Sequence, residues 1–455
     1  MKIEEVLNSF NQFVRVNFMA ESFECIPLAK QVEQLTQQFV ELWWRCDSSF
    51  PTFDQVFTGI DHKRNDAALQ AYVRRMETEL KNPPVSPQGR ETARRCITNL
   101  STTFARDTLG FTDRQLDVIL SYGFLDASAR FAEEARRFDP MVSEDDIYQA
   151  SRNVMTMNFI QLLLGRSVTL TPAIFAYSML YPYTDNYLDD PAVSADVKHA
   201  FIERFRSRLG GEGVLPANQH ERLIWELVWM VEQQYPRVQY ERVYESLYAI
   251  HDAQCRSLSL LNHVSSPYEV DVLSLIFEKG GTSVLADGYL VAGELTEEQS
   301  RFMFAYGAYT QLMDDMEDIL SDRAAGVQTL FSQTAGRWPL DELTNHTFHF
   351  GNQVFKTLDC FTGAEADALK ELIWRTIDPM LIASAGTYPQ FYSRAYLKQL
   401  EDHLPFSFAG LQKVRTRLER EKFSMVGLVK TFAPSAEAID LRLSAFNLQS
   451  QAILP

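Results

Sequence analysis

Cysteine is scarce in this sequence and follows no pattern. The chain has five cysteines among 455 residues, and none of them forms a Cys-x-x-Cys pair. An odd, scattered set predicts neither a disulfide framework nor a zinc site, so a reducing, cytoplasmic setting is expected. The first residues mix acids with Arg15 where a secretory signal would need an apolar core, and no targeting segment is expected.

Positive charge is also in short supply. The chain has 43 Lys and Arg against 60 Asp and Glu, which gives a formal net charge of -17. Nucleic-acid binding depends on a basic surface that displaces counterions, and no Lys/Arg-rich block occurs. No nucleic-acid partner is expected, and an acidic protein of this kind would need metal ions or a local basic patch to bind an anion.

No apolar run is a convincing membrane span. The longest uncharged run is SVTLTPAIFAYSMLYPYT, residues 167–184, close to the minimum of about 17 residues for a spanning helix. It contains Pro172 and Pro182 and is followed at once by Asp185. We expect a helix buried inside the protein and no transmembrane segment.

The composition is that of a globular protein, with 46% hydrophobic and 23% charged residues. Apolar residues recur mainly at helical spacing, and strand-like alternation is nearly absent. Helix starts are expected at capping-box patterns that begin at Thr52, Thr112, Ser143, Thr296 and Thr362. Repeated helix starts without intervening strands predict an all-α protein.

One proline-rich segment suggests how the chain is divided. In KNPPVSPQG, residues 81–89, prolines end one helix and Ser86-Pro87 is placed to begin another. We therefore expect an N-terminal helical extension over residues 1–88, a catalytic helical core over 89–400, and a helical tail over 401–455 packed on that core.

Two acidic clusters follow apolar helical segments. In QLMDDMEDILSD, residues 311–322, four aspartates fall within an arc of about 100° on a helix; they are Asp314, Asp315, Asp318 and Asp322. In YTDNYLDDP, residues 183–191, Asp185 and Asp189 lie one above the other, with Asp190 to one side. A solvated face explains one such cluster more easily than two. Carboxylates from facing helices can form a metal site in a bundle, and without His or Cys they suit Mg²⁺.

These motifs resemble those of the class I isoprenoid synthases, the superfamily of trans-prenyltransferases, class I terpene cyclases and squalene or phytoene synthases. QLMDDMED is similar to the Q-x-x-D-D-x-x-D motif of trans-prenyltransferases, and DNYLDD resembles the first aspartate-rich motif. Further similar elements are Lys279 to Thr282, Asp322, Gly326, Thr329 and Leu330. The resemblance implies the all-α bundle of that superfamily, and a homodimer is common within it.

Two departures favour one branch of this superfamily. The first motif reads D-N-x-x-D-D, and the paired arginines that follow it in chain-elongating enzymes are missing, because Arg204, Arg206 and Arg208 come too late. No G-G-K-R element is present near the start of the core. The resemblance therefore implies a class I terpene synthase that acts on one prenyl diphosphate. A trans-prenyltransferase that also uses isopentenyl diphosphate, a head-to-head condensing enzyme, and a non-enzymatic helical scaffold remain alternatives.

The resemblance also implies roles for individual residues. Three Mg²⁺ ions with the diphosphate would be held by Asp185, Asp189, Asp190, Asp314, Asp315 and Asp318, and would stabilise charge on the leaving diphosphate as a carbocation forms. With Lys279, the pairs Asp185/Asp189 and Asp314/Asp315 are the expected catalytic set. Further substrate contacts are expected from Arg323, Gln254, Arg256, Gln311, Tyr181 and Tyr177, although surface exposure for Arg323 and core packing for the tyrosines are the alternatives. Phe277, Phe304 and Tyr306 are expected in the core, and His251 is expected to be structural.

Overall fold

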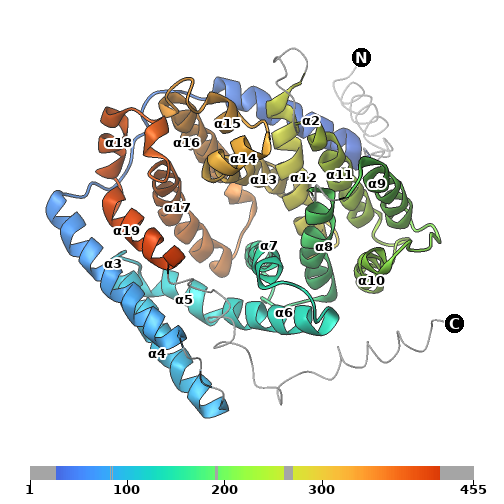
Figure 1. Ribbon diagram of the computed structural model, residues 1–455, viewed down its shortest axis with the longest axis horizontal. Helices are drawn as coiled ribbons and strands as arrows, with labels where there is room; N and C mark the ends of the chain where they lie inside the picture. The colour runs from blue at the N-terminus through green and yellow to red at the C-terminus, as the bar shows by residue number, and fades with distance from the viewer. Residues whose placement is uncertain (1–26, 82–83, 85, 190–192, 261–269, 421–455) are drawn as a thin grey trace, which may run out of the picture.

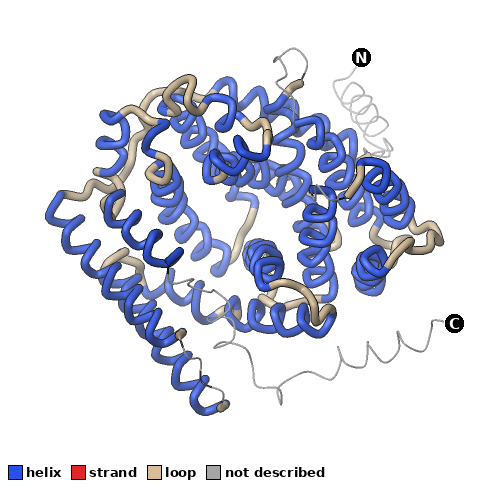
Figure 2. Tube along the Cα trace, viewed as in Figure 1, coloured by secondary structure: helices blue, strands red, loops and turns tan. Residues whose placement is uncertain are grey.

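The computed structural model describes residues 27–81, 84, 86–189, 193–260 and 270–420. Within these ranges every regular element is a helix, which confirms the all-α prediction (Figures 1 and 2). The α-helices are α2 (Leu28–Arg45), α3 (Gly59–Leu80), α4 (Pro87–Asp107), α5 (Asp113–Ser121), α6 (Phe124–Phe138), α7 (Glu144–Leu163), α8 (Pro172–Asp189), α9 (Ala195–Leu209), α10 (Gln219–Gln234), α11 (Glu241–Ser257), α12 (Val272–Ala292), α13 (Glu297–Glu317), α14 (Ile319–Ala325), α15 (Leu330–Thr334), α16 (Asp341–Phe355), α17 (Ala364–Ala385), α18 (Arg394–Glu401) and α19 (Phe408–Arg420). Short 3₁₀ turns lie at Leu258–Leu260, Lys356–Cys360 and Pro389–Phe391.

The central pair of the fold is α12 and α13. A tight connection after Gly293 reverses the chain, and Thr296 begins α13 with the expected capping box to Gln299. Helices α2, α7, α8 and α11 all pack on α12, and α16 and α17 pack on α13. Figure 1 shows α7 near the middle of the molecule, between α8 and α17. The acidic end of α13 and the middle of α7 therefore belong to the same bundle.

Three glycines let α12 and α13 approach backbone to backbone. A Cβ atom at Gly280 would collide with the carbonyl of Gly307, and one at Gly307 would collide with the carbonyl of Gly280. A Cβ at Gly281 would lie 2.6 Å from the ring of Phe304. Thr282 is fully buried and donates its hydroxyl to the carbonyl of Glu278 over 2.6 Å. In the Lys-Gly-Gly-Thr segment, Gly280 and Gly281 thus serve the helix crossing and Thr282 bonds within its own helix. Lys279 is left beside α13.

The first described helix packs directly on the central pair. Helix α2 lies over α12, α13 and α16, where the Phe39 ring contacts Phe304 at 6.1 Å and the Trp43 ring contacts Phe277 at 6.1 Å. Both aromatic residues belong to the main hydrophobic cluster. Helices α3 and α4 pair with each other at one edge of the molecule (Figure 1). The proline-rich break before α4 is confirmed, since Ser86 caps that helix.

The C-terminal tail returns to the N-terminal edge. Helix α19 packs against α3, and Arg417 forms an ion pair with Glu77 in which Nε lies 2.7 Å from Oε1. The part of the expected tail beyond residue 420 lies outside the described residues. Residues 401–420 thus connect α18 to the α3/α4 edge.

The uncharged run around residue 174 forms α8, as expected. Ala173, Ile174 and Met179 have no accessible surface, and Pro182 lies inside the helix. The hydroxyl of Tyr183 donates to Asp139 over 2.5 Å and its carbonyl contacts Nε2 of His220 at 2.8 Å, so the end of α8 is fixed from two sides. Among the described residues, no helix is both long and apolar enough to cross a membrane.

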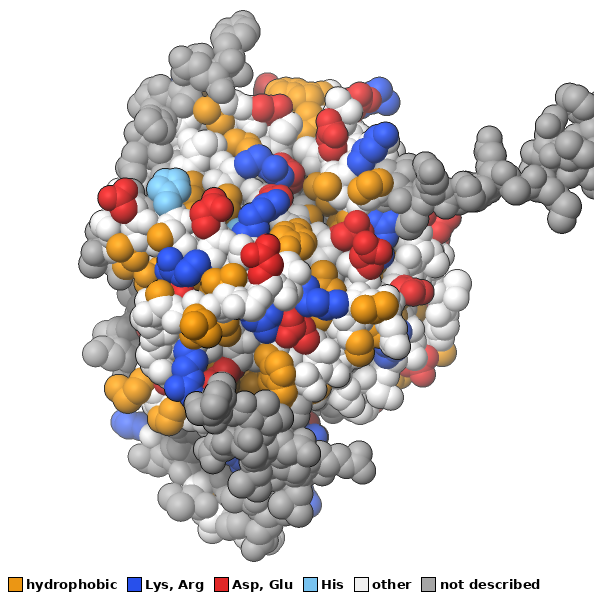
Figure 3. Space-filling model, turned by 90° about the vertical axis from the view of Figure 1, so that its right-hand side faces the viewer, with side chains coloured by type: hydrophobic (Ala, Val, Ile, Leu, Met, Phe, Trp, Pro, Cys, Tyr) orange, Lys and Arg blue, Asp and Glu red, His pale blue; other side chains and the backbone are white. Residues whose placement is uncertain are grey.

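The face that carries α9 and α10 is a mosaic of both charges. Figure 3 shows Lys and Arg side chains next to Asp and Glu on this face. Arg204 contacts Glu221 at 3.0 Å, and Arg208 contacts Glu232 at 2.6 Å. These arginines follow the first acidic motif in the sequence, and acids on α10 already neutralise them.

Candidate functional site

The second acidic stretch spans two helices that meet at an aspartate. Helix α13 ends at Glu317, and Asp318 is both its C-cap and the N-cap of α14. The backbone N–H of Asp322 still donates to the carbonyl of Asp318 over 2.8 Å. The single helix expected from the sequence is therefore bent at Asp318, and its aspartates remain next to one another.

Asp315 is the buried member of this cluster. Its side chain is 4% exposed, Oδ1 accepts a hydrogen bond from Gln311 over 3.0 Å, and Oδ2 has no partner. Burial raises the pKa of Asp315 to about 8, the charges of Asp322 and Asp314 raise it further, and the positive charge of Lys279 opposes the shift. A carboxylate oxygen without a partner at a buried position is a ready acceptor for a cation or a donor group.

Asp314 is the half-exposed member of the cluster. Its side chain keeps 49% of its surface accessible, yet burial is the main cause that raises its pKa. Oδ1 of Asp314 accepts a hydrogen bond from the guanidinium of Arg152 on α7 over 3.1 Å, which lowers the pKa in opposition to burial.

Asp318 and Asp322 extend the cluster onto α14. Burial raises the pKa of Asp318, and the charge of Glu317 adds to this effect. Burial also raises the pKa of Asp322 to about 7, and the charge of Asp318 adds to it, while Lys279 and a hydrogen bond with Thr329 oppose it. Lys279 thus lies within electrostatic reach of both Asp315 and Asp322.

The first motif is described only in part. Asp185 accepts a hydrogen bond from Thr184 over 3.3 Å, and its charge raises the pKa of Tyr177, for which burial is the main cause. Asp189 is the last residue of α8 and its side chain is not described, while Asp190 lies outside the described residues. The hydroxyl of Tyr177 donates to the carbonyl of Ser283 on α12 over 3.4 Å.

Arg152 on α7 links the end of α13 to α8. Its guanidinium bonds to Asp314 on α13, and it also interacts electrostatically with Tyr148 on its own helix and with Tyr181 on α8. The side chain of Tyr181 is 43% exposed. The second half of α8 and the end of α13 therefore lie around the same arginine. Sequence reasoning missed Arg152 because its segment, ASRNVMT, carries no motif.

Two of the expected phosphate ligands have other partners. Arg323 donates to the carbonyl of Ala335 and its guanidinium lies 5.8 Å from the ring centroid of Phe391. Nε of Arg256 donates to Glu278 over 3.1 Å. Gln254 is half-buried on α11, two residues before Arg256. Gln311 does reach the cluster, through Asp315.

The residues expected to be structural behave as such. Phe277 and Phe304 have no accessible surface. Burial lowers the pKa of His251 to about 4, and its ring packs on Phe205 at 5.2 Å. Tyr306 is half-buried, burial raises its pKa to about 12, and the charges of Asp287 and Asp314 contribute to the shift. It lies between the acidic end of α13 and a buried acid that the sequence reading did not single out.

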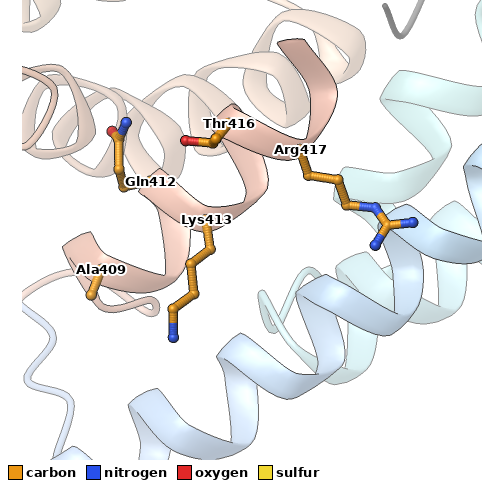
Figure 4. A pocket seen from close by; sticks show the side chains of 5 residues that line it. All are labelled: Ala409, Gln412, Lys413, Thr416 and Arg417. Atoms are coloured by element: carbon orange, nitrogen blue, oxygen red, sulfur yellow. The ribbon is translucent and has the colours of Figure 1, made fainter. Parts of the chain in front are cut away.

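A groove of about 420 Å³ lies elsewhere, on the edge where α19 meets α3. Figure 4 shows the side chains that line it, which are Ala409, Gln412, Lys413, Thr416 and Arg417. Arg417 is engaged by Glu77, and Lys413 and Thr416 are exposed. The groove is an open, solvated surface on other helices than those of the acidic cluster.

Within the described residues, no three His, Cys, Asp or Glu side chains are arranged so that they could hold a metal ion. A scan against models of protein families gave no match to the chain, and a search of curated proteins gave none either. The functional argument therefore depends on the site itself.

Proposed function

We propose that this chain is a class I terpene synthase, which ionises a prenyl diphosphate with Mg²⁺ and releases diphosphate and a terpene. The observation that carries the proposal is the meeting of Asp314 and Asp315 with two cations, Arg152 and Lys279, at one end of the helical bundle. Carboxylates and cations close together are what a metal-bound anion needs.

The α13 side of the site offers donors of the type suited to Mg²⁺, although their arrangement in the ligand-free described residues is not that of a metal site. Its donors are carboxylate oxygens, which Mg²⁺ prefers, and Oδ2 of Asp315 has no protein partner. We assign Asp314, Asp315 and Asp318 to metal binding, with Asp185 and Asp189 from the first motif and Asp190 as a helper. Bound Mg²⁺ would supply Lewis-acid stabilisation of the departing diphosphate. The fit rests on α13, since Asp185 is the only first-motif carboxylate that the described residues include with its side chain.

Arg152 and Lys279 are the side chains we assign to the diphosphate. A guanidinium can hold two phosphate oxygens at once, and an ammonium acts as a compact positive charge. In the ligand-free protein Arg152 is paired with Asp314. A diphosphate would offer this guanidinium more negative charge than one carboxylate does, so Arg152 can turn from Asp314 to the substrate.

Aromatic and thioether side chains next to these charges suit a hydrocarbon chain. Tyr148 and Met155 on α7 and Tyr181 on α8 are among the large hydrophobic residues that remain exposed. Tyr177 and Tyr306 lie deeper and are half-buried. Aromatic faces attract cations, which suits a carbocation formed from a prenyl chain. These residues support the assignment of a prenyl chain as substrate.

The alternatives have less support. Arg204 and Arg208 are paired with glutamates on α10, so they offer no free pair of arginines for a second diphosphate, as chain elongation would need. An interaction scaffold with solvated acidic faces does not account for Asp315, which is 4% exposed. No observation on the described residues specifically supports either alternative.

The test is incubation of the protein and Mg²⁺ with geranyl, farnesyl, geranylgeranyl and longer diphosphates, with and without isopentenyl diphosphate. We expect diphosphate release and a terpene product without isopentenyl diphosphate. Asp314→Ala with Asp315→Ala should abolish turnover, whereas Glu297→Ala with Glu298→Ala, at the opposite end of α13, should not. Chain lengthening would establish a prenyltransferase instead, and the absence of diphosphate release from every substrate would favour the scaffold.

A further inference from the structure

A buried polar network joins α12 to two neighbouring helices. Asp287 on α12 has no accessible surface, and its Oδ1 accepts a hydrogen bond from Nδ2 of Asn153 on α7 over 3.1 Å. The same amide nitrogen donates to the hydroxyl oxygen of Ser178 on α8 over 3.2 Å. Asn153 therefore ties α7 to α8 and α12 at once.

Burial of Asp287 in the helical core destabilises the fold. Its Oδ2 has no hydrogen-bond partner. Burial raises the pKa of Asp287 well above its usual range, and the bond from Asn153 opposes this only in part. Burying a polar atom without a partner destabilises a fold, and an aliphatic side chain of similar size would remove the penalty. Packing alone gives no reason for an acid at this position.

The neighbour of Asn153 in the chain is Arg152. Consecutive residues of a helix point about 100° apart, so one turn of α7 sends Asn153 inward to Asp287 and Arg152 across to Asp314. The apolar contacts of α7 are not directional, whereas hydrogen bonds require a defined geometry. The amide of Asn153 thus sets the rotation of α7 about its own axis at the position where Arg152 projects.

We propose that Asp287 is a positioning residue for the diphosphate site, which acts through Asn153 to fix the rotation of α7 and so the direction in which Arg152 projects toward the acidic end of α13. The inference rests on the proposed function, because it takes Arg152 as a ligand of the substrate diphosphate. Asp287 itself does not touch the substrate, since no part of it is accessible. Its role is to fix the direction from which the guanidinium reaches the acidic end of α13.

A double-mutant cycle tests this role. Asp287→Leu and Arg152→Ala are made singly and together in the full chain, and KM and kcat are measured with the prenyl diphosphate that gives the highest turnover. We expect Asp287→Leu to raise KM about tenfold when Arg152 is present and to leave KM unchanged in the Arg152→Ala background, since coupled residues depart from additivity to this extent. Asp287→Asn should keep a KM near that of the wild type, because its amide oxygen still accepts from Asn153.

Two further variants keep the test decisive. Asn153→Ala should reproduce the effect of Asp287→Leu and replaces it in the cycle if that variant fails to fold, as judged by circular dichroism and Tm. Ser246→Ala removes another fully buried hydroxyl, on α11, and should leave KM unchanged in both backgrounds. An Asp287→Leu effect of equal size with and without Arg152, or no effect in either, overturns the inference. A wild-type protein that releases no diphosphate overturns the proposed function, and the inference with it.

Discussion

Arg152 on α7 and Asp314 on α13 lie 162 positions apart in the chain and are joined by a hydrogen bond of 3.1 Å. This ion pair joins α7, which carries no sequence motif, to α13, which carries the most specific motif of the chain. Asp314, which we propose as a metal ligand, therefore has a cationic partner in the ligand-free protein.

Replacement of Arg152 should weaken substrate binding more than it weakens the fold. Arg152→Ala removes a guanidinium whose side chain is 62% exposed, so the loss of stability should be below about 1 kcal/mol. The KM for the prenyl diphosphate should rise by about tenfold or more, since a charge-assisted phosphate contact is lost. Arg45→Ala, which breaks an exposed pair with Glu41, is the matched control. An unchanged KM in steady-state kinetics would remove Arg152 from the site.

The stability of the metal-free protein should fall as the pH rises. The pKa of Asp315 is about 8 and that of Asp322 about 7, because both are buried, whereas an aspartate in an unfolded chain has a pKa of about 4. Between these values the folded state holds more protons than the unfolded state, so the free energy of unfolding decreases with pH.

Asp315→Asn isolates this effect. We expect the variant to have the Tm of the wild type near pH 4 and to exceed it by about 5 °C at pH 9, when both are measured with a chelator. The difference between the two Tm profiles is the quantity that decides. A difference that does not grow with pH would show that Asp315 is ionised in the folded protein.

The α12/α13 crossing should tolerate no added methyl group. Gly307→Ala places a Cβ against the Gly280 carbonyl, and overpacking of this kind costs about 1–3 kcal/mol. Urea unfolding should show that loss. Gly59→Ala, at a position with no atom within 4 Å of the added Cβ, should change stability by less than about 1 kcal/mol. Equal effects of the two substitutions would contradict the close crossing.

Arg323 and Lys279 should separate into structural and functional roles. Arg323→Ala removes the donor to the Ala335 carbonyl and the contact with Phe391, so it should lower stability by about 1 kcal/mol and leave KM unchanged. Lys279→Ala should lower kcat/KM at least tenfold with little change in Tm, because it removes a positive charge beside Asp315 and Asp322. Kinetics and thermal unfolding of both variants decide the matter, and a raised KM for Arg323→Ala would return it to the site.

Capping patterns predicted helix starts correctly where tertiary packing did not override them. The capping boxes at Thr112 and Thr296 are present, and Ser143 caps α7. The expected start at Thr52 is wrong, because α3 begins at Gly59, capped by Thr58. The residues around Phe53 stay irregular while its ring packs on Phe348 at 5.2 Å. At Thr362 the helix does begin nearby, but Gly363 is the N-cap and no side chain caps it. Tertiary packing and backbone geometry decide such cases, and neither is visible in a four-residue pattern.

In the candidate site, too, local sequence patterns reveal some residues and only tertiary packing reveals the others. Helical spacing was enough to group Asp314, Asp315 and Asp318, because they share one stretch of chain. Arg152 becomes a neighbour of that stretch only through the packing of α7, and Asp287 reaches the residue beside Arg152 only through the packing of α12 on α7, so no spacing rule finds them. A lone acid in the apolar segment SVLADGYLV was the one signal that could have singled out Asp287.

The contact of Gly280 with Gly307 also has a mechanical consequence. Where two helices touch through their backbones, no layer of side chains is left at the crossing to slide or repack, so we expect α12 and α13 to move together. Lys279 and Asp315 then keep their separation whatever the neighbouring helices do. A change in the distance between Arg152 and this pair would therefore come from α7, which packs on α12.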